Sequence, residues 1–294
     1  MSLRDRLRGT GVALVTPFTA QLEVDYNALG NVIDFVIKDG VEYVVTLGTT
    51  GETPTLQKEE KKAIVEYTYE KVAGRVPVVV GIGGNNTAEV IREIEETPLD
   101  KAIAILSASP YYSKPSQEGL YQHYKALAAS TPKPIMLYNV PGRTGRNIEA
   151  DTIIRLAHEV DNIAGIKEAG GDMAQCMKVL RDKPADFLVV SGDDALVLPQ
   201  VACGMEGIIS VAANSFPKVF SEMVRYCLAG DFKNAKALND KLIEGYELLF
   251  AENNPAGVKA ALAELGIIGN YLRLPVVPVS KGLQEKIKKY VASL

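Results

Sequence analysis

The chain has 294 residues and a formal net charge of −4, with 47% hydrophobic and 23% charged residues. A single barrel of eight strand–helix units takes roughly 250 residues, so one barrel with a short extension fits the length. The weak negative charge, without a run rich in lysine and arginine, argues against a nucleic-acid partner. No stretch approaches the roughly 20 apolar residues that span a bilayer, so no membrane partner is expected.

Cysteine and histidine are scarce. The three cysteines, Cys176, Cys203 and Cys227, are an odd number without close spacing, which argues against a disulfide framework and against a zinc site. The two histidines, His123 and His158, both fall in expected helices. We therefore expect no metal site. We also expect a cytoplasmic protein, because the first residues carry no apolar segment like that of a secretory signal.

Short β-branched runs recur along the chain, and each is followed by a segment with the apolar spacing of a helix. Nearly continuous apolar runs are typical of parallel strands that are covered on both faces. The distance from run to run, roughly 25 to 35 residues, is that of a βα unit. The eight expected strands cover residues 12–18, 43–47, 76–82, 102–108, 134–138, 163–166, 187–191 and 207–211.

Residues that favour helix N-termini precede several of the helical segments. The expected starts are Asp25, Thr87, Ser116, Asp151 and Asp172. After the eighth strand the pattern is helical throughout, over residues 217–229, 232–250, 255–265 and 283–291.

These patterns predict an α/β protein. We expect a (β/α)₈ barrel as the catalytic domain over residues 1–228, and a helical extension packed on it over residues 229–294. An open doubly wound sheet is the alternative. Such a sheet usually has a glycine-rich turn after its first strand, and here Thr16-Pro17-Phe18 occupies that place.

The most informative polar residue is Lys167, because catalytic groups in such barrels lie at the C-terminal ends of the strands. Alternate residues of a strand share a face, so Ile163, Gly165 and Lys167 are expected to point into the barrel. An ammonium group there is costly unless it is paired or loses its proton, and carbonyl addition requires a neutral amine. The alternative is an ion pair of Lys167 with Glu168 or Asp193.

Two further strand ends carry suitable polar groups. Tyr138 shares a face with Met136, and a phenol beside an amine can shuttle protons during carbonyl addition. The alternative for Tyr138 is a core tyrosine with a satisfied hydroxyl. The segment Gly-Thr-Thr-Gly at residues 48–51 offers hydroxyls and backbone N–H groups that could hold a carboxylate, and an ordinary turn is its alternative.

Six segments resemble those of the dihydrodipicolinate synthase family, within the superfamily of class I pyruvate-dependent aldolases and N-acetylneuraminate lyase. They occur in order and at compatible spacing over nearly the whole chain. The segments are GTTGETPTL (48–56), SPYYSKPSQEGLYQHY (109–124), YNVPGRTG (138–145), GIKEAGGD (165–172), SGDD (191–194) and GIISVAAN (207–214).

The resemblance implies a lyase of the diaminopimelate route to lysine, also called 4-hydroxy-tetrahydrodipicolinate synthase. Such enzymes condense pyruvate with L-aspartate 4-semialdehyde and use no cofactor. By resemblance, Lys167 would form a Schiff base with pyruvate, and Tyr138, Thr49 and Tyr112 would relay protons. Tyr112 would act in the active site of a neighbouring subunit, within a homotetramer built from tight dimers.

The resemblance also assigns substrate binding to Thr50, Arg143, Gly192 and Ile209. The first alternative is a lyase for N-acetylneuraminate or for a 2-keto-3-deoxy sugar acid. Arg143 argues against the sialic-acid branch, which resembles this chain but typically has an apolar residue there. The second alternative is a non-catalytic barrel that only binds a small acid or a partner protein, and the competent side chain at every relay position argues against it.

One departure from the family pattern concerns regulation. Members inhibited by lysine carry histidines, or a glutamate at the second position, where this chain has Lys58 and Lys61. Asn85, Glu89 and Tyr111 keep the rest of that regulatory pattern. A cationic pair would repel the ammonium group of lysine, so we expect weak or absent feedback inhibition.

Overall fold

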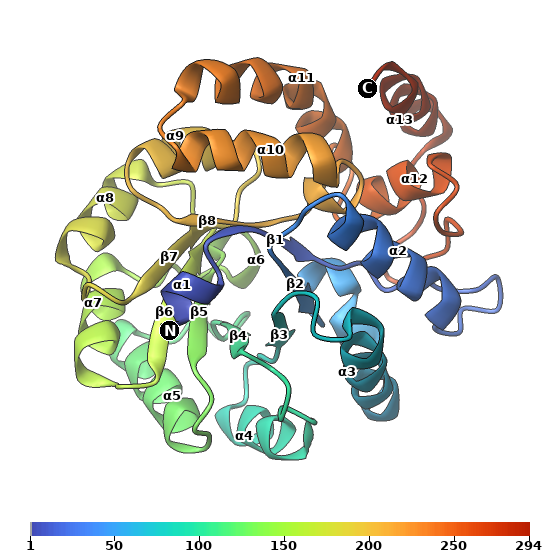
Figure 1. Ribbon diagram of the computed structural model, residues 1–294. Helices are drawn as coiled ribbons and strands as arrows, with labels where there is room; N and C mark the ends of the chain where they lie inside the picture. Colours follow the sequence, from blue (N-terminus) through green and yellow to red (C-terminus); the bar gives the residue numbers. More distant parts are fainter. Residues whose placement is uncertain (1) are drawn as a thin grey trace.

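Eight parallel strands close into one barrel in the computed structural model, which describes residues 2–294 (Figure 1). Each strand pairs with the next along the chain, and β8 pairs with β1 to close the ring. The predicted α/β barrel is therefore confirmed. The strands are β1 (Gly9–Ala13), β2 (Tyr43–Thr46), β3 (Val78–Gly81), β4 (Ala104–Ala108), β5 (Ile135–Asn139), β6 (Ile163–Glu168), β7 (Leu188–Ser191) and β8 (Gly207–Ser210).

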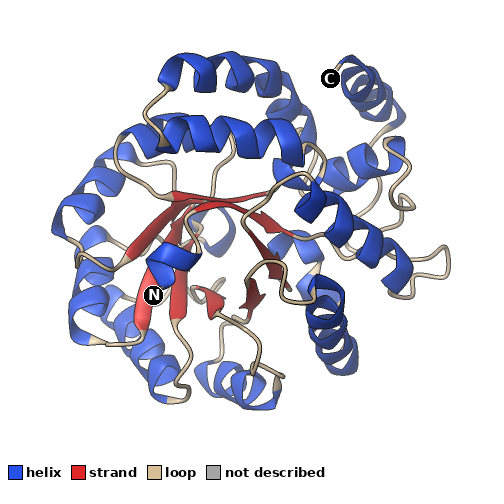
Figure 2. Cartoon of the chain, in the orientation of Figure 1, coloured by secondary structure: helices blue, strands red, loops and turns tan. Residues whose placement is uncertain are grey.

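Helices surround the barrel on its outside (Figure 2). A short N-terminal helix, α1 (Leu3–Arg6), comes before the first strand. The helices that follow the strands are α2 (Tyr26–Lys38), α3 (Lys58–Val72), α4 (Thr87–Glu96), α5 (Gln117–Ala129), α6 (Pro141–Thr144), α7 (Ala150–Glu159), α8 (Met173–Asp182), α9 (Val197–Ala202) and α10 (Pro217–Leu228). Met1, the first residue of the expected barrel domain, lies outside the described residues.

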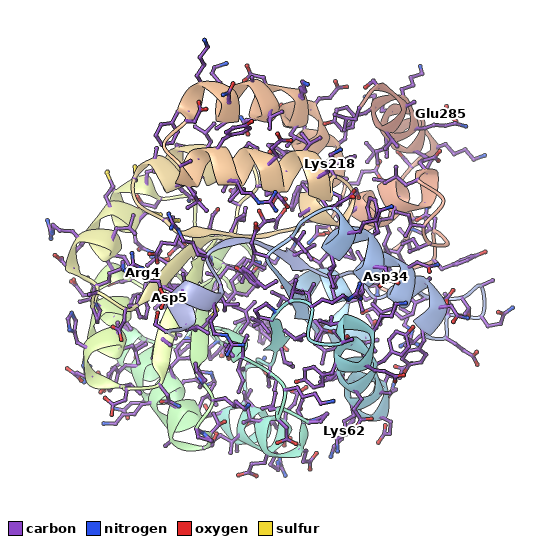
Figure 3. The ribbon with its side chains drawn as sticks, viewed as in Figure 1. Arg4, Asp5, Asp34, Lys62, Lys218 and Glu285 are labelled. Carbon is purple, nitrogen blue, oxygen red and sulfur yellow. The ribbon has the colours of Figure 1, made fainter. Side chains whose placement is uncertain are left out.

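Three helices form the extension after α10. They are α11 (Phe232–Phe250), α12 (Ala256–Glu264) and α13 (Lys281–Ser293), and α11 packs along α10 (Figure 1). Charged side chains such as Lys62 and Glu285 lie at the outer rim of the molecule (Figure 3). Among the helices of residues 2–294, none combines the length and apolar character needed to span a bilayer.

The apolar residues form two cores. The larger core lies between the strands and the helices, and the smaller one fills the barrel interior. Tyr43 is fully buried in the interior, where its hydroxyl donates to the carbonyl of Ile208 at 3.2 Å. The interior core consists of Leu7, Ala13, Tyr43, Val45, Val79, Ala104, Leu106, Met136, Tyr138, Val140, Leu188, Val190 and Ile209.

The first strand begins earlier than its predicted range of 12–18. Gly9 and Gly11 belong to β1, although glycine usually weakens a strand. A Cβ atom on Gly11 would lie 2.1 Å from the Tyr43 ring, so the glycine makes room for that ring. The predicted end at Phe18 is also wrong, because Phe18 lies beyond the strand and forms an antiparallel bridge with Val24.

Strand β6 contains an irregularity that strict alternation does not anticipate. Ile135 pairs with Ile163, but the next residue of β5, Met136, pairs with Gly165, so β6 has one extra residue at this point. Ile163 consequently lies in the outer core, and its predicted inward orientation is wrong. Lys167 still faces inward, because the alternation holds again after the extra residue.

Most of the predicted helix starts agree with the observed caps. The side chains of Asp25, Ser116 and Asp172 accept hydrogen bonds from backbone N–H groups in the first turns of α2, α5 and α8. Two starts are displaced by a short distance. Asn86 caps α4 in place of Thr87, and Asp151 lies within the first turn of α7, which begins at Ala150.

Candidate active site

A cavity of about 620 Å³ lies at the C-terminal ends of the strands, where this type of barrel carries its chemistry. Its wall combines residues from the strand ends with residues from the helical extension. The lining residues are Thr49, Thr50, Tyr138, Val140, Gly142, Arg143, Lys167, Ala169, Gly192, Asp193, Ala195, Val211, Asn239, Ile243, Tyr246, Glu247, Phe250 and Asn254.

Lys167 and Tyr138 lie side by side in this cavity. They are direct partners in the register of β5 and β6, so their side chains emerge on the same face. The Lys167 Nζ atom lies 4.4 Å from the centre of the Tyr138 ring, and both side chains are buried. A phenol and an amine that line one cavity can both act on a carbonyl group bound there.

The alternative of an ion pair at Lys167 is not observed. Within residues 2–294, no carboxylate oxygen lies within 4.0 Å of its Nζ atom. Glu168 instead accepts hydrogen bonds from Asn139, at 2.9 and 3.0 Å, and from Gln175 and the N–H of Gly170. Burial raises the pKa of Glu168, and these hydrogen bonds partly offset the effect. The Lys167 amine is thus left facing the cavity.

Gly192 leaves the space that the lysine side chain occupies. A Cβ atom at this position would lie 2.8 Å from Cε of Lys167, 3.1 Å from its Cγ and 2.7 Å from the Cβ of Ala169. A larger residue would therefore displace the Lys167 side chain. Ile209, the other residue expected to line the pocket through its main chain, packs in the interior core two residues before Val211, which does line the cavity.

The two threonines of the Gly-Thr-Thr-Gly segment lie on the wall of the same cavity. They belong to a short helical turn, η1 (Thr49–Gly51), which follows β2. The Thr50 hydroxyl accepts a hydrogen bond from the side-chain amide of Asn254, at 3.2 Å. The turn presents hydroxyl groups to the cavity, as a carboxylate site requires.

Arg143 lies on the short helix α6 and lines two neighbouring cavities. The second cavity has a volume of about 340 Å³ and shares Thr49 and Tyr138 with the first. The guanidinium group therefore stands where the two spaces meet, within the reach of a ligand that already contacts Tyr138. An exposed arginine in this place is well suited to bind a second carboxylate.

Tyr112 does not join the other predicted relay residues within its own chain. Tyr112 is 89% exposed, and it lines neither of the two cavities. Its backbone lies in the left-handed region, at φ 68°, and its N–H donates to the carbonyl of Thr144 at 3.3 Å. Tyr111, by contrast, lines the smaller cavity together with Lys61.

The predicted regulatory residues are only partly together. Lys58, Lys61 and Glu89 line a surface hollow of about 320 Å³ between α3 and α4, whereas Asn85 and Tyr111 are not among its lining residues. Both lysines are already paired there. Lys61 contacts Glu93 at 2.8 Å, and Lys58 forms an ion pair with Glu96.

The sequence patterns missed the contribution of the helical extension to the site. Five residues on one face of α11 line the larger cavity, and Asn254 follows that helix. Their spacing is helical, which a sequence can show, but no sequence signal says which structure that face covers. The five residues are Asn239, Ile243, Tyr246, Glu247 and Phe250.

Asp194 is a second residue whose importance the motif alone did not reveal. It is buried beside the cavity, and one carboxylate oxygen accepts the N–H groups of Val211 at 3.2 Å and Ala212 at 2.9 Å. These contacts hold the turn after β8. Burial raises the pKa of Asp194 to about 6, although hydrogen bonds from Ser210 and Ala212 oppose the shift.

Within residues 2–294 there is no group of three or more histidine, cysteine, aspartate and glutamate side chains that could hold a metal ion. His123, one of the two histidines, is buried and contacts the hydroxyl of Thr87 at 2.8 Å. Burial lowers the pKa of His123 to about 4. It lies on α5 and is not among the residues that line the active-site cavity.

Comparisons with known proteins give one consistent result. A sequence model described as the dihydrodipicolinate synthetase family matches residues 6–294. The chain belongs to this family. The 4-hydroxy-tetrahydrodipicolinate synthase of Parabacteroides distasonis is 49% identical over 288 residues, which are 98% of this chain and 97% of that protein.

Two crystal structures are similarly close in fold. The chloride-inhibited dihydrodipicolinate synthase of Acinetobacter baumannii, complexed with pyruvate, has a TM-score of 0.94 at 39% identity, over 97% of this chain and 98% of that one. The enzyme of Cyanidioschyzon merolae with lysine bound has a TM-score of 0.94 at 33% identity, over 98% of each chain. The resemblance seen in the motifs is confirmed, the chain is a lyase, and a synthase is favoured over a sugar-acid lyase.

Titration of Asp194 predicts a measurable pH dependence of stability. Its folded pKa of about 6 lies above the unfolded value of 3.8, so the folded state binds the proton more tightly. The resulting stabilisation, about 3 kcal/mol, is fully present below pH 3.8 and is lost as the pH rises through about 6. Asp194→Asn should remove this pH-dependent part of the free energy of unfolding, which denaturant unfolding at a series of pH values measures. Parallel pH profiles for both proteins would contradict the prediction.

Proposed function

We propose that Lys167 forms a Schiff base with pyruvate, and that the derived enamine attacks the aldehyde of L-aspartate 4-semialdehyde. The observation that carries this proposal is the buried Lys167 amine, which faces the cavity beside Tyr138 without an ion-pair partner among residues 2–294. The pyruvate complex of the related Acinetobacter baumannii enzyme supports the choice of the keto acid.

The reaction begins when the neutral Lys167 amine adds to the C2 carbonyl of pyruvate and gives a carbinolamine. The Tyr138 hydroxyl donates a proton to the departing oxygen, and water leaves as the iminium forms. The Tyr138 phenolate then takes a proton from the methyl group, which gives the enamine. The terminal carbon of the enamine attacks the aldehyde carbon, and the aldehyde oxygen takes that proton back from Tyr138. The amino group of the adduct then attacks C2, which closes the ring and releases Lys167.

The two carboxylates of the substrates have separate partners in this proposal. The hydroxyls of Thr49 and Thr50 hold the carboxylate of pyruvate, and Arg143 binds that of the aldehyde substrate. The main chain at Gly192 and Ile209 borders the pyruvate. The iminium formed on Lys167 provides the electron sink that a cofactor would otherwise supply, so no cofactor is required.

We further propose that Tyr112 completes the proton relay in a neighbouring subunit, within a homotetramer of tight dimers. Its support is the exposure of Tyr112, a residue 89% exposed that lies outside the cavities of its own chain and has a left-handed backbone conformation. Exposed tyrosines are common in protein interfaces.

A cytoplasmic location completes the proposal. The cysteines of residues 2–294 are all free thiols, as is usual in a reducing compartment. Cell fractionation tests this assignment, and recovery of the enzyme outside the cytoplasmic fraction would overturn it.

Borohydride trapping tests the central step. After incubation with pyruvate and reduction, the native chain should gain the mass of one reduced pyruvate on the peptide that contains Lys167. Lys167→Met should gain none. Arg143→Ala should still form the adduct but lose turnover with the aldehyde, because the first substrate binds without Arg143. An unmodified native chain, or an adduct on another lysine, would overturn the proposal.

Subunit mixing tests the role of Tyr112. Tyr112→Phe should lower turnover because the relay loses its proton, and Lys167→Met should be inactive. In a mixed dimer, one site combines the native Lys167 of one chain with the native Tyr112 of the other, so activity should return when the two variants are mixed. Mixtures no more active than Tyr112→Phe alone would contradict the shared site.

Inhibition assays test the expected absence of feedback inhibition by lysine. Lys58 and Lys61 form ion pairs with Glu96 and Glu93 in the hollow between α3 and α4, so these two carboxylates are already occupied by cations and cannot receive an incoming ammonium group. Initial rates of the native enzyme should therefore stay unchanged at lysine concentrations below millimolar. Inhibition in this range would show that lysine binds despite the two cations.

A further inference from the structure

Glu52 connects the threonine pair to the rest of the chain in an unusual conformation. It lies between the short turns η1 (Thr49–Gly51) and η2 (Thr53–Thr55), at φ 53° and ψ 32°. This left-handed region is unfavourable for a residue that carries a Cβ atom. The Glu52 side chain is only 1% exposed, so its buried contacts can hold the turn in place.

Those contacts come from the helical extension. The ammonium group of Lys259, on α12, forms an ion pair with Oε1 of Glu52, and the N–H of Arg273 donates to Oε2 at 3.1 Å. Lys259 is fully buried; its Nζ also donates to the carbonyl of Tyr271 at 3.0 Å and lies 4.2 Å from the centre of the Phe18 ring. Both carboxylate oxygens of Glu52 are therefore held by residues far away in the sequence.

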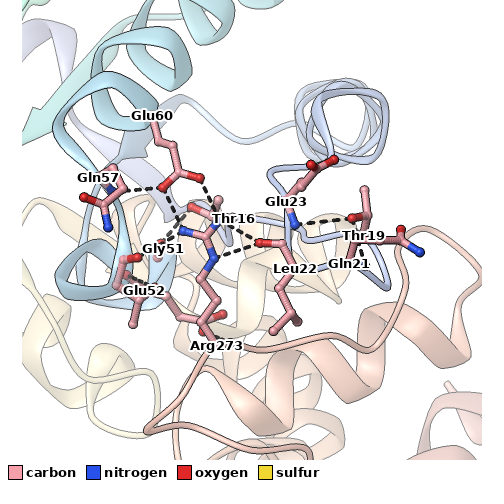
Figure 4. A network of polar contacts seen from close by, with 11 residues as sticks. Thr16, Thr19, Gln21, Leu22, Glu23, Gly51, Glu52, Gln57, Glu60 and Arg273 are labelled. Carbon is pink, nitrogen blue, oxygen red and sulfur yellow. Dashed lines mark hydrogen bonds and ion pairs between the residues drawn. The ribbon is translucent and has the colours of Figure 1, made fainter.

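Arg273 extends this anchor around the outside of the turn (Figure 4). Its guanidinium group forms two hydrogen bonds to the carboxylate of Glu60, at 2.6 and 2.7 Å. It also donates to the carbonyls of Thr55 at 3.0 Å and Leu22 at 2.7 Å. The group thus ties the end of η2 and the first turn of α3 to the extension.

We propose that Lys259 and Arg273 are positioning residues that hold the Thr49–Thr50 turn in register with Lys167. Glu52, Lys259 and Arg273 are not among the residues that line the active-site cavity, so they act through the threonines.

The proposal rests on the function proposed above and has a specific kinetic consequence. The carboxylate of pyruvate must sit on the threonine hydroxyls for its C2 atom to reach the Lys167 amine, and small displacements of bound groups are costly to rate. A loosened turn should therefore weaken the capture of pyruvate. Arg143 lies on α6, which is not among the segments that the side chains of Lys259 and Arg273 hold in place, so binding of the aldehyde substrate should not change.

The test uses Lys259→Met, with Lys236→Met as a matched control. Lys236 lies on α11 in the same extension, where it forms an exposed ion pair with Asp240. The readout is the pyruvate concentration that gives half-maximal borohydride trapping, normalised to folded protein by near-ultraviolet circular dichroism. Lys259→Met should raise it roughly tenfold, and the control should not. The KM for the aldehyde should stay the same.

Two more variants separate positioning from folding. Lys259→Met leaves the Glu52 carboxylate buried without its ammonium partner, so the variant can lose stability. The double variant with Glu52→Gln removes that charge and should recover stability, while the weak capture of pyruvate remains. Arg273→Leu leaves the buried pair intact and should also weaken capture.

The outcomes distinguish this inference from the proposed function. If the native chain traps pyruvate, and the folded variants at positions 259 and 273 trap it with unchanged half-saturation, the positioning role is overturned. Recovery of both stability and capture in the double variant would also overturn it. A native chain that forms no adduct would instead remove the proposed function itself.

Discussion

The register of β5 against β6 determines the chemistry of the barrel mouth. It places Tyr138 opposite Lys167 on the inner face and Asn139 opposite Glu168 on the outer face. Glu168 follows Lys167 in the sequence. Its carboxylate accepts hydrogen bonds from Asn139 on the outer face and is thereby kept away from the Lys167 amine. Carbonyl addition needs an amine without a carboxylate partner, and a phenol beside it can move protons. This one strand pairing therefore brings together the two groups of the proposed site and keeps the nearest carboxylate away from the amine.

The sequence was sufficient for the barrel and for the strand ends, because both depend on local patterns. Apolar runs mark the strands, and polar residues that follow them must lie at one end of a parallel barrel. The alternation of side chains along a strand correctly predicted that Met136, Tyr138 and Lys167 point inward. The prediction was wrong at Ile163, because β6 has an extra residue after it. A bulge of this kind depends on the neighbouring strand, and a single segment does not reveal it.

The remaining part of the site is non-local. The first strand was predicted to begin at residue 12, yet Gly9 and Gly11 also belong to β1, and the Tyr43 ring fills the space beside Gly11. The face of α11 that covers the cavity has ordinary helical spacing, and only the packed structure shows what it covers. The roles proposed for Thr50 and Arg143 rest on the family resemblance, because the local pattern offered only a turn with hydroxyl groups at residues 48–51 and no role for Arg143.

The helical extension contributes one partner of a buried ion pair, and burying these charges costs free energy. Placing the charges of Lys259 and Glu52 in the interior requires both to leave water, and well-packed apolar residues could fill the same volume without that penalty. An ion pair differs from apolar packing in direction, since it fixes where each partner's atoms lie. The left-handed backbone at Glu52 needs such a directional contact. An apolar side chain in its place would not fix the position of the Glu52 carboxylate, and the turn could relax to a more favourable conformation. The buried charges are therefore better explained by the geometry of the threonine pair than by stability.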